Sequence, residues 1–120
     1  MNIEIPGVDV KNGLEICDGD TKIYLRFLRL YVSNMPSALD KMRNVSEETL
    51  QDYTVSVHGV KGISETIGAE EARKTAKELE MMGKSGDLVG ILAQNAAFIK
   101  YAENLVNNIK NWLAKHDAAS

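Results

Sequence analysis

The sequence predicts an all-α protein, built as an antiparallel helical bundle with short loops. Pro6 and Pro36 are the only prolines, so residues 37–120 contain none. Alanine, lysine and glutamate, which favour helices, occur throughout that stretch. Apolar residues recur every three or four positions along most of the chain, as on the buried face of a helix. A length of 120 residues supports a single domain, residues 1–120.

The N-terminal part is expected to hold an extended lead-in followed by short helices. Residues 1–10 form the lead-in, and a short helix is predicted over residues 10–17. A turn follows, and Asp20 is well placed to cap the next helix. Pro36 fits the first turn of another short helix, which reaches about residue 44. The apolar face of the helix after Asp20 consists of Ile23, Phe27 (with Tyr24 and Leu28), Leu30 and Tyr31.

The segment 53–57 gives conflicting signals. Its β-branched residues alternate, and alone it reads as a strand. The helical spacing continues beyond it, however, while the alternation stops at Gly59. Length therefore favours a helix from about residue 46 to Gly68, a residue suited to the left-handed position at a helix end. The apolar face of this helix consists of Leu50, Tyr53, Val57, Val60, Ile63 with Ser64, and Ile67.

Two further helices complete the predicted bundle. One covers residues 69–82 and is closed by Gly83. The last and longest covers about residues 87–115. Residues 116–120 are expected to form a frayed tail.

Charge balance and cysteine content exclude several classes of function. The 14 basic and 17 acidic residues give a net charge of −3, so a general nucleic-acid binder is not expected. The single cysteine, Cys17, permits neither an internal disulfide framework nor thiolate metal ligation, and we expect it to fill a small space in the core. No segment has the length and apolarity of a membrane span. These features indicate a reduced, cytoplasmic domain.

His58 is predicted to point away from the buried face of its helix. At about 100° per residue, the apolar residues of that helix lie on the opposite side. Gly59 and Gly62 lie beside the histidine inside the helix, and each costs about 1 kcal/mol relative to alanine. A stable bundle gains nothing from two such residues on one exposed face. Their small size has a functional explanation, because it lets another macromolecule approach the imidazole closely.

Lys61 lies one turn from His58 on the same face. A nearby cation favours the neutral, nucleophilic imidazole, and the ammonium is suited to pairing with phosphoryl oxygens. An exposed histidine with these neighbours is a candidate phosphoryl acceptor. The other side chains expected around it are Gln51, Thr54, Val55 and Glu65. Ser64 is expected to face a neighbouring helix.

The twelve residues from His58 to Ala69, HGVKGISETIGA, resemble the H-x-x-K-G-x-S-x-x-[ILV]-G-A signature of histidine-containing phosphotransfer (Hpt) domains. The lead-in Ile5-Pro6-Gly7-Val8-Asp9, with Gly13-Leu14 and Gly19-Asp20, also resembles the start of many bacterial members. The similarity covers essentially the whole chain. One departure is Gly59, where the family more often has threonine, alanine or glutamine.

The resemblance implies a four-helix bundle with one or two short additional helices near the N-terminus. It also implies a phosphorelay carrier, in which His58 accepts a phosphoryl group from a receiver-domain aspartate and passes it to another receiver. Lys61 and Gly62 then support the histidine, and Ser64 has a packing or orienting role.

The implied partners are response-regulator receiver domains and a hybrid histidine kinase, with no nucleic acid and no membrane. We expect such a carrier to be a monomer that catalyses no reaction by itself. It binds no cofactor of its own and relies on Mg²⁺ held by the receiver.

Two other interpretations remain open: an inactive helical interaction module, or the phosphoacceptor domain of a larger hybrid histidine kinase. His116, near the C-terminus, is expected to be exposed and without a role. Gly83-Lys84-Ser85 mimics the end of a P-loop, but Glu78 occupies the position where that motif needs glycine.

Overall fold

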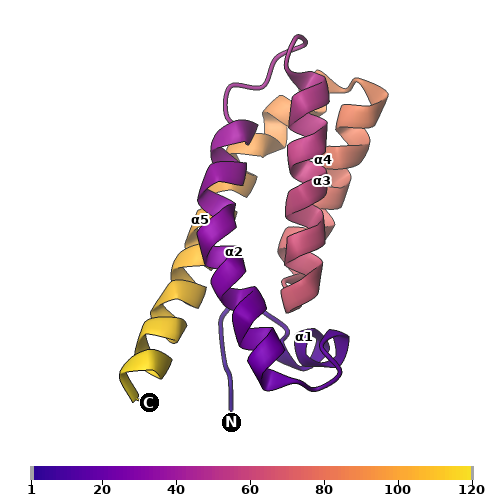
Figure 1. Ribbon diagram of the computed structural model, residues 1–120. Helices are drawn as coiled ribbons and strands as arrows, with labels where there is room; N and C mark the ends of the chain where they lie inside the picture. Colours follow the sequence, from indigo (N-terminus) through magenta and orange to yellow (C-terminus); the bar gives the residue numbers. More distant parts are fainter. Residues whose placement is uncertain (1, 120) are drawn as a thin grey trace.

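Five α-helices make up the structure, a computed structural model that describes residues 2–119 (Figure 1). The helices are α1 (Val10–Ile16), α2 (Thr21–Met42), α3 (Leu50–Ile67), α4 (Glu70–Ser85) and α5 (Leu88–Ala119). No strand occurs within residues 2–119, which confirms the predicted all-α class. None of the helices in this range is long and apolar enough to cross a membrane.

Helices α2 to α5 form an elongated four-helix bundle, with the short helix α1 at one end (Figure 1). Helix α3 packs between α2 and α4, and α5 closes the bundle by packing on both α2 and α4. The molecule is 48 Å long, which matches the 32 residues of α5 at about 1.5 Å per residue. Helix α1 packs against α3 and α2. It is the one short helix that precedes the bundle.

Helix α2 is continuous through Pro36, where the sequence predicted a break between two helices. Proline removes one hydrogen bond from a helix. Pro36 is exposed while its neighbour Met35 is fully buried, so the missing bond lies on the solvent side of α2. The predicted apolar face of α2 is correct for Tyr24, Leu28 and Tyr31, which are buried. It is wrong for Ile23 and Leu30, which are 39% and 47% exposed. The buried residues are Tyr24, Leu28, Tyr31, Met35, Leu39 and Met42.

Other helix boundaries differ from the predicted ones as well. Helix α3 begins at Leu50, later than expected. Helix α4 continues through Gly83 and ends on Gly86, whose φ of 76° is left-handed. Helix α5 remains helical to Ala119, so the expected frayed tail is wrong for residues 116–119. Ser120 lies outside the described residues.

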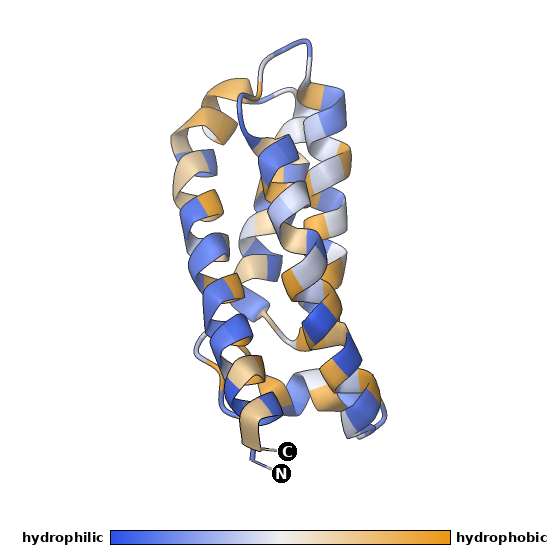
Figure 2. Ribbon diagram, turned by 60° about the vertical axis from the view of Figure 1, so that its left-hand side comes forward, coloured by the Kyte–Doolittle hydropathy of each residue, from blue (hydrophilic) through white to orange (hydrophobic). Residues whose placement is uncertain are grey.

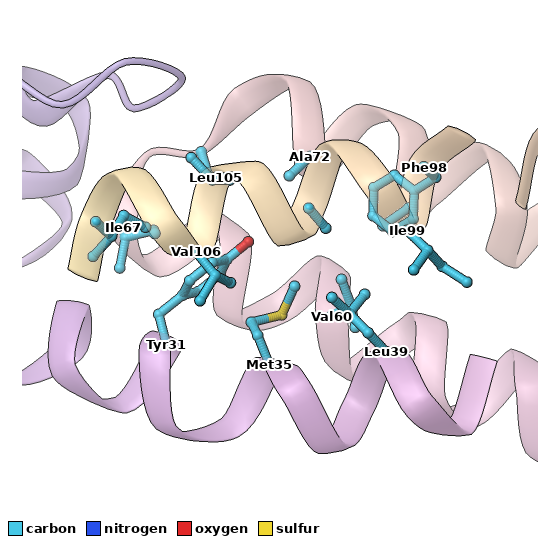
Figure 3. Packing of buried hydrophobic residues seen from close by; sticks show 14 of the residues in the cluster. Tyr31, Met35, Leu39, Val60, Ile67, Ala72, Phe98, Ile99, Leu105 and Val106 are labelled. Atoms are coloured by element: carbon cyan, nitrogen blue, oxygen red, sulfur yellow. The ribbon is translucent and has the colours of Figure 1, made fainter. Parts of the chain in front are cut away.

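The core fills the space between the four long helices (Figure 3). The side chains that meet there include Tyr31, Met35 and Leu39 of α2, Val60 and Ile67 of α3, Ala72 of α4, and Phe98, Ile99, Leu105 and Val106 of α5. Along each helix, hydrophobic residues alternate with hydrophilic ones, as a bundle with one solvated face per helix requires (Figure 2). Cys17 is free and buried in this core, as expected.

Buried hydrogen bonds fix the rotation of α3 in the bundle. The hydroxyl of Tyr31 in α2 lies 3.0 Å from Oγ of Ser64, so the neighbouring helix that Ser64 faces is α2. On another side, the hydroxyl of Tyr53 donates to Oδ1 of Asn95 in α5 at 2.8 Å. Because buried polar groups must keep their partners, these bonds determine which residues α3 presents to solvent.

Gly68 joins the end of α3 to the N-terminal segment. Its φ is 80°, and its carbonyl accepts a hydrogen bond from the backbone N–H of Asp9 at 2.8 Å. A Cβ atom at this position would overlap the carbonyl oxygen of Asp9. We expect Gly68→Ala to lower the free energy of unfolding by about 2–3 kcal/mol, because backbone strain and this overlap add.

Gly86→Ala is the matched control for this prediction. Gly86 has φ of 76° but open space around its Cβ position, so only the strain of about 1 kcal/mol remains. Urea denaturation measures both variants. Equal losses of stability in the two variants would contradict the contact with Asp9.

Candidate functional site

His58 lies on the solvent-facing side of α3, as its helical spacing predicts. Its side chain is 66% exposed. The opposite side of α3 buries Tyr53, Val57, Val60, Ser64 and Ile67. The imidazole is therefore open to a partner, while the helix that carries it is held by the core.

Glu80 of α4 is the partner of His58 within the fold. The Glu80 side chain is only 4% exposed, and its Oε2 lies 2.6 Å from Nδ1 of His58. Its other oxygen, Oε1, accepts a hydrogen bond from Nζ of Lys61 at 2.7 Å. Nζ of Lys84, one turn further along α4, lies 3.4 Å from Oε2. One buried carboxylate thus joins the histidine and two lysines.

The close packing of α3 on α4 brings these groups together. Glu80 follows Ala76 by one helical turn, which directs it to the face that packs on α3. One turn beyond it, a Cβ atom at Gly83 would overlap Oγ1 of Thr54 in α3. The glycine lets the two helices approach closely at this level, and Oγ1 of Thr54 donates to the carbonyl of Leu50 at 2.8 Å.

The surroundings of Glu80 keep it ionised. The hydrogen bond from Lys61 is the main cause that lowers its pKa, to about 2, against the opposing effect of burial. The hydrogen bond with His58 and the charges of Lys61 and Lys84 act in the same direction. An ionised carboxylate only accepts hydrogen bonds, so Nδ1 of His58 carries the proton between them. In the neutral ring, Nε2 then keeps the lone pair.

Lys61 is placed differently from the sequence prediction. We expected its ammonium to act directly on the imidazole and on phosphoryl oxygens. In the structure Lys61 is bound to Oε1 of Glu80, and its side chain is only 25% exposed. Lys61 and His58 therefore bind the two oxygens of the same carboxylate.

The glycines next to His58 leave its face of α3 bare. A Cβ atom on Gly59 or Gly62 would meet no atom within 4 Å. Both positions are exposed, and so is Val55, at 68%, one turn before His58. No packing requirement within residues 2–119 accounts for glycine at either position.

The remaining predicted neighbours do not gather on the imidazole. Gln51 and Glu65 are exposed, each seven residues from His58 and so about two turns away. Thr54 is half-buried against Gly83 and belongs to the helix interface. His116 is half-buried and stacks on Trp112, with ring centroids 5.0 Å apart, so the expectation of an exposed side chain is wrong.

Sequence reasoning missed Glu80 and Lys84. One signal was available, because Glu80 shares a helical face with the small apolar residues Ala72 and Ala76. An acidic residue on a buried face needs a cationic partner. The partner itself lies on another helix, however, and only the packing of α3 on α4 identifies it.

Comparison with known protein families gives one match. The profile described as Hpt domain matches residues 26–112, which include all of α3 and α4 and most of α2 and α5. Neither the curated proteins nor the solved structures gave a match. The family match agrees with the observed helical bundle and covers well over half of the chain. The chain therefore belongs to the Hpt domain family, whose members take part in histidine phosphotransfer in phosphorelays.

Proposed function

We propose that this protein carries a phosphoryl group on His58, which it accepts from a receiver-domain aspartate and passes to another receiver. The observation that carries the proposal is the exposed imidazole whose Nδ1 is bound to buried Glu80. This arrangement leaves Nε2 as the atom available to a partner.

The proposed transfer is a displacement at phosphorus. The lone pair of Nε2 forms the N–P bond, and the bond from phosphorus to the aspartyl oxygen breaks with its electron pair left on the receiver's carboxylate. The proton on Nδ1 stays in place, so the ring becomes cationic as the bond forms. Glu80, 2.6 Å away and ionised, stabilises this developing charge. In the return transfer the same steps run in reverse.

This chemistry assigns different roles to the receiver and to this protein. The receiver holds Mg²⁺ and the groups that stabilise the transferring phosphoryl group. This chain supplies the histidine, orients it through Glu80 and leaves space above Gly59 and Gly62. In this proposal it is a carrier and no enzyme by itself. A hybrid histidine kinase supplies the phosphate, and the protein acts as a cytoplasmic monomer.

Transfer of label tests the proposal. A purified receiver domain is loaded with ³²P, the protein is added, and both chains are separated at short times. We expect label to appear on this protein in a form that is labile in acid and stable in base, as for a phosphoramidate. An inactive interaction module would bind the receiver without acquiring label, and that outcome would refute the proposed function.

Substitution of Gly62 tests whether a partner approaches the bare face. Because a side chain there meets no neighbour, Gly62→Ala should raise the free energy of unfolding by about 0.5–1 kcal/mol through helix propensity. Gly62→Leu should also fold, but a bulky group one turn from His58 should hold a receiver away and slow transfer by at least about tenfold.

Two controls separate docking from chemistry at Gly62. Ala114→Leu adds bulk at an exposed position of α5 and should leave transfer unchanged. Phosphoramidate is a small donor that needs no protein interface, so it should label Gly62→Leu at the wild-type rate. Unchanged transfer from the receiver to Gly62→Leu would show that the partner does not approach over this glycine.

A further inference from the structure

Two lysines share the carboxylate of Glu80, but they are held in different ways. Lys61 lies 2.7 Å from Oε1, and its side chain is 25% exposed. Lys84 lies 3.4 Å from Oε2, and its side chain is 67% exposed. The first contact is a short, partly buried hydrogen bond. The second is a longer, solvated ion pair, a class that contributes little to stability.

The two oxygens of Glu80 differ in whether they keep a hydrogen-bond donor when their lysine moves away. Among residues 2–119, Lys61 alone donates to Oε1, so its departure leaves a buried carboxylate oxygen without a donor, which is costly. Oε2 also accepts from Nδ1 of His58 at 2.6 Å, so it keeps a donor when Lys84 leaves. Lys84 is therefore the lysine that is free to turn toward another anion.

Lys84 contacts the same carboxylate oxygen as the imidazole of His58, through Nζ and Nδ1 respectively. Gly83 precedes it in the chain and packs against Thr54, so this part of α4 lies close to α3. The flexible four-carbon stem of a lysine allows the ammonium to move from Oε2 toward a group on the ring.

We infer that Lys84 pairs with the phosphoryl group on His58, while Lys61 remains on Glu80 and fixes that carboxylate. This inference rests on the proposed function of His58. A phosphoryl group on Nε2 brings up to two negative charges to a ring whose Nδ1 is already bound to an ionised carboxylate. An exposed ammonium that exchanges Oε2 for a phosphoryl oxygen offsets this repulsion. No covalent bond to Lys84 forms, and its protons stay on the ammonium.

Loading by phosphoramidate tests the inference without a receiver. Nε2 of His58 forms the N–P bond, and the bond from phosphorus to the donor nitrogen breaks to release ammonia. We expect Lys84→Gln in the full chain to be loaded about fivefold more slowly than the wild type. Lys84→Arg, which keeps the charge, should restore the rate to within about twofold. Lys110→Gln removes the same charge from an exposed position of α5 and should have no effect.

Urea denaturation of the unloaded protein separates the two lysines. Lys61→Gln should lower the unfolding midpoint, because it leaves Oε1 of Glu80 without its donor. Lys84→Gln should leave the midpoint within error of the wild type. If Lys84 had only a structural role, Lys84→Gln would lower the midpoint and would still be loaded at the wild-type rate.

The possible failures are distinguishable. If the wild type is loaded on His58 and Lys84→Gln is loaded at the same rate, the inference about Lys84 is wrong and the proposed function stands. If the wild type acquires no phosphoryl group on His58, the proposed function fails and the inference fails with it.

Discussion

Replacing His58 with glutamine is expected to reduce labelling by a phosphorylated receiver to background. Glutamine retains a polar side chain on the exposed face of α3, but it has no nitrogen lone pair able to form the N–P bond. His58 is 66% exposed and belongs to no packed layer, so the variant should fold and unfold like the wild type. The measurement is ³²P transfer at short times, accompanied by circular dichroism and urea denaturation.

His116→Gln is the matched control, because it removes the other histidine of the chain. His116 stacks on Trp112 in α5 and lies outside the cluster around Glu80. Labelling of this variant should equal that of the wild type. If His58→Gln accepts label as well as the wild type does, His58 is not the acceptor.

Replacing Glu80 is expected to have the second-largest effect. Glu80→Gln still offers an oxygen to Nδ1 of His58, but it lacks the negative charge that stabilises the cationic ring during transfer. Charge-assisted hydrogen bonds are about twice as strong as neutral ones, so we expect loading by phosphoramidate to slow by about tenfold. Glu80→Ala removes the acceptor as well, which releases the ring orientation and should slow loading further.

Replacing Glu80 should also lower the free energy of unfolding, and the size of this loss should depend on pH in a defined direction. The pKa of Glu80 is lowered from the ordinary 4.5 to about 2, with the Lys61 hydrogen bond as the main cause. Because its pKa is lower in the folded state, ionised Glu80 contributes its full stabilisation above about pH 4.5. This contribution is lost as the pH falls through about 2. The stability advantage of wild type over Glu80→Gln, about 1–2 kcal/mol at pH 7, should therefore shrink on acidification.

Glu78→Gln is the control for both effects. Glu78 lies on the same helix and is exposed, so its substitution should change neither loading nor stability measurably. Loading of Glu80→Gln at the wild-type rate would contradict the role given to this carboxylate. A stability difference that stays constant between pH 7 and pH 3 would contradict its lowered pKa.

Local sequence signals sufficed for α3 and for the exposure of His58. The apolar spacing continues through the segment 53–57, whose β-branched residues alone favour a strand, and the segment is helical. Gly68 was expected to end this helix, and it does so with a left-handed φ. Both features depend on residues within a few turns of one another, which is the range that helical periodicity describes.

Pro36 and Gly83 show where local signals fail. Proline favours a helix start, yet α2 passes through Pro36 because burial of Met35 and Leu39 on its inner face outweighs one lost hydrogen bond. Glycine favours a helix end, yet α4 continues through Gly83. Glycine is needed there because a Cβ atom would overlap the side chain of Thr54 in α3. In both cases tertiary packing overrides the propensity of a single residue.

Sequence predicted the part of the site that lies on α3, but not the part that lies on α4. His58, Lys61 and Gly62 stand in register in one segment of sequence, and the resemblance to Hpt domains rests on that segment. Glu80 lies 22 residues from His58, on a helix whose rotation is set by packing on α3. No spacing rule within one helix relates these two residues. Sequence therefore predicted the exposed histidine but not the buried carboxylate that contacts it.

NMR of the phosphorylated protein tests the central claim most directly. The protein is labelled with ¹⁵N-histidine, loaded with phosphoramidate, and examined by ¹⁵N and ³¹P spectra in the same sample. We expect one phosphoryl group per chain, bonded to Nε2 of His58, with the proton retained on Nδ1 beside Glu80. A phosphoryl group on Nδ1 of His58, on His116 or on a carboxylate would contradict the account.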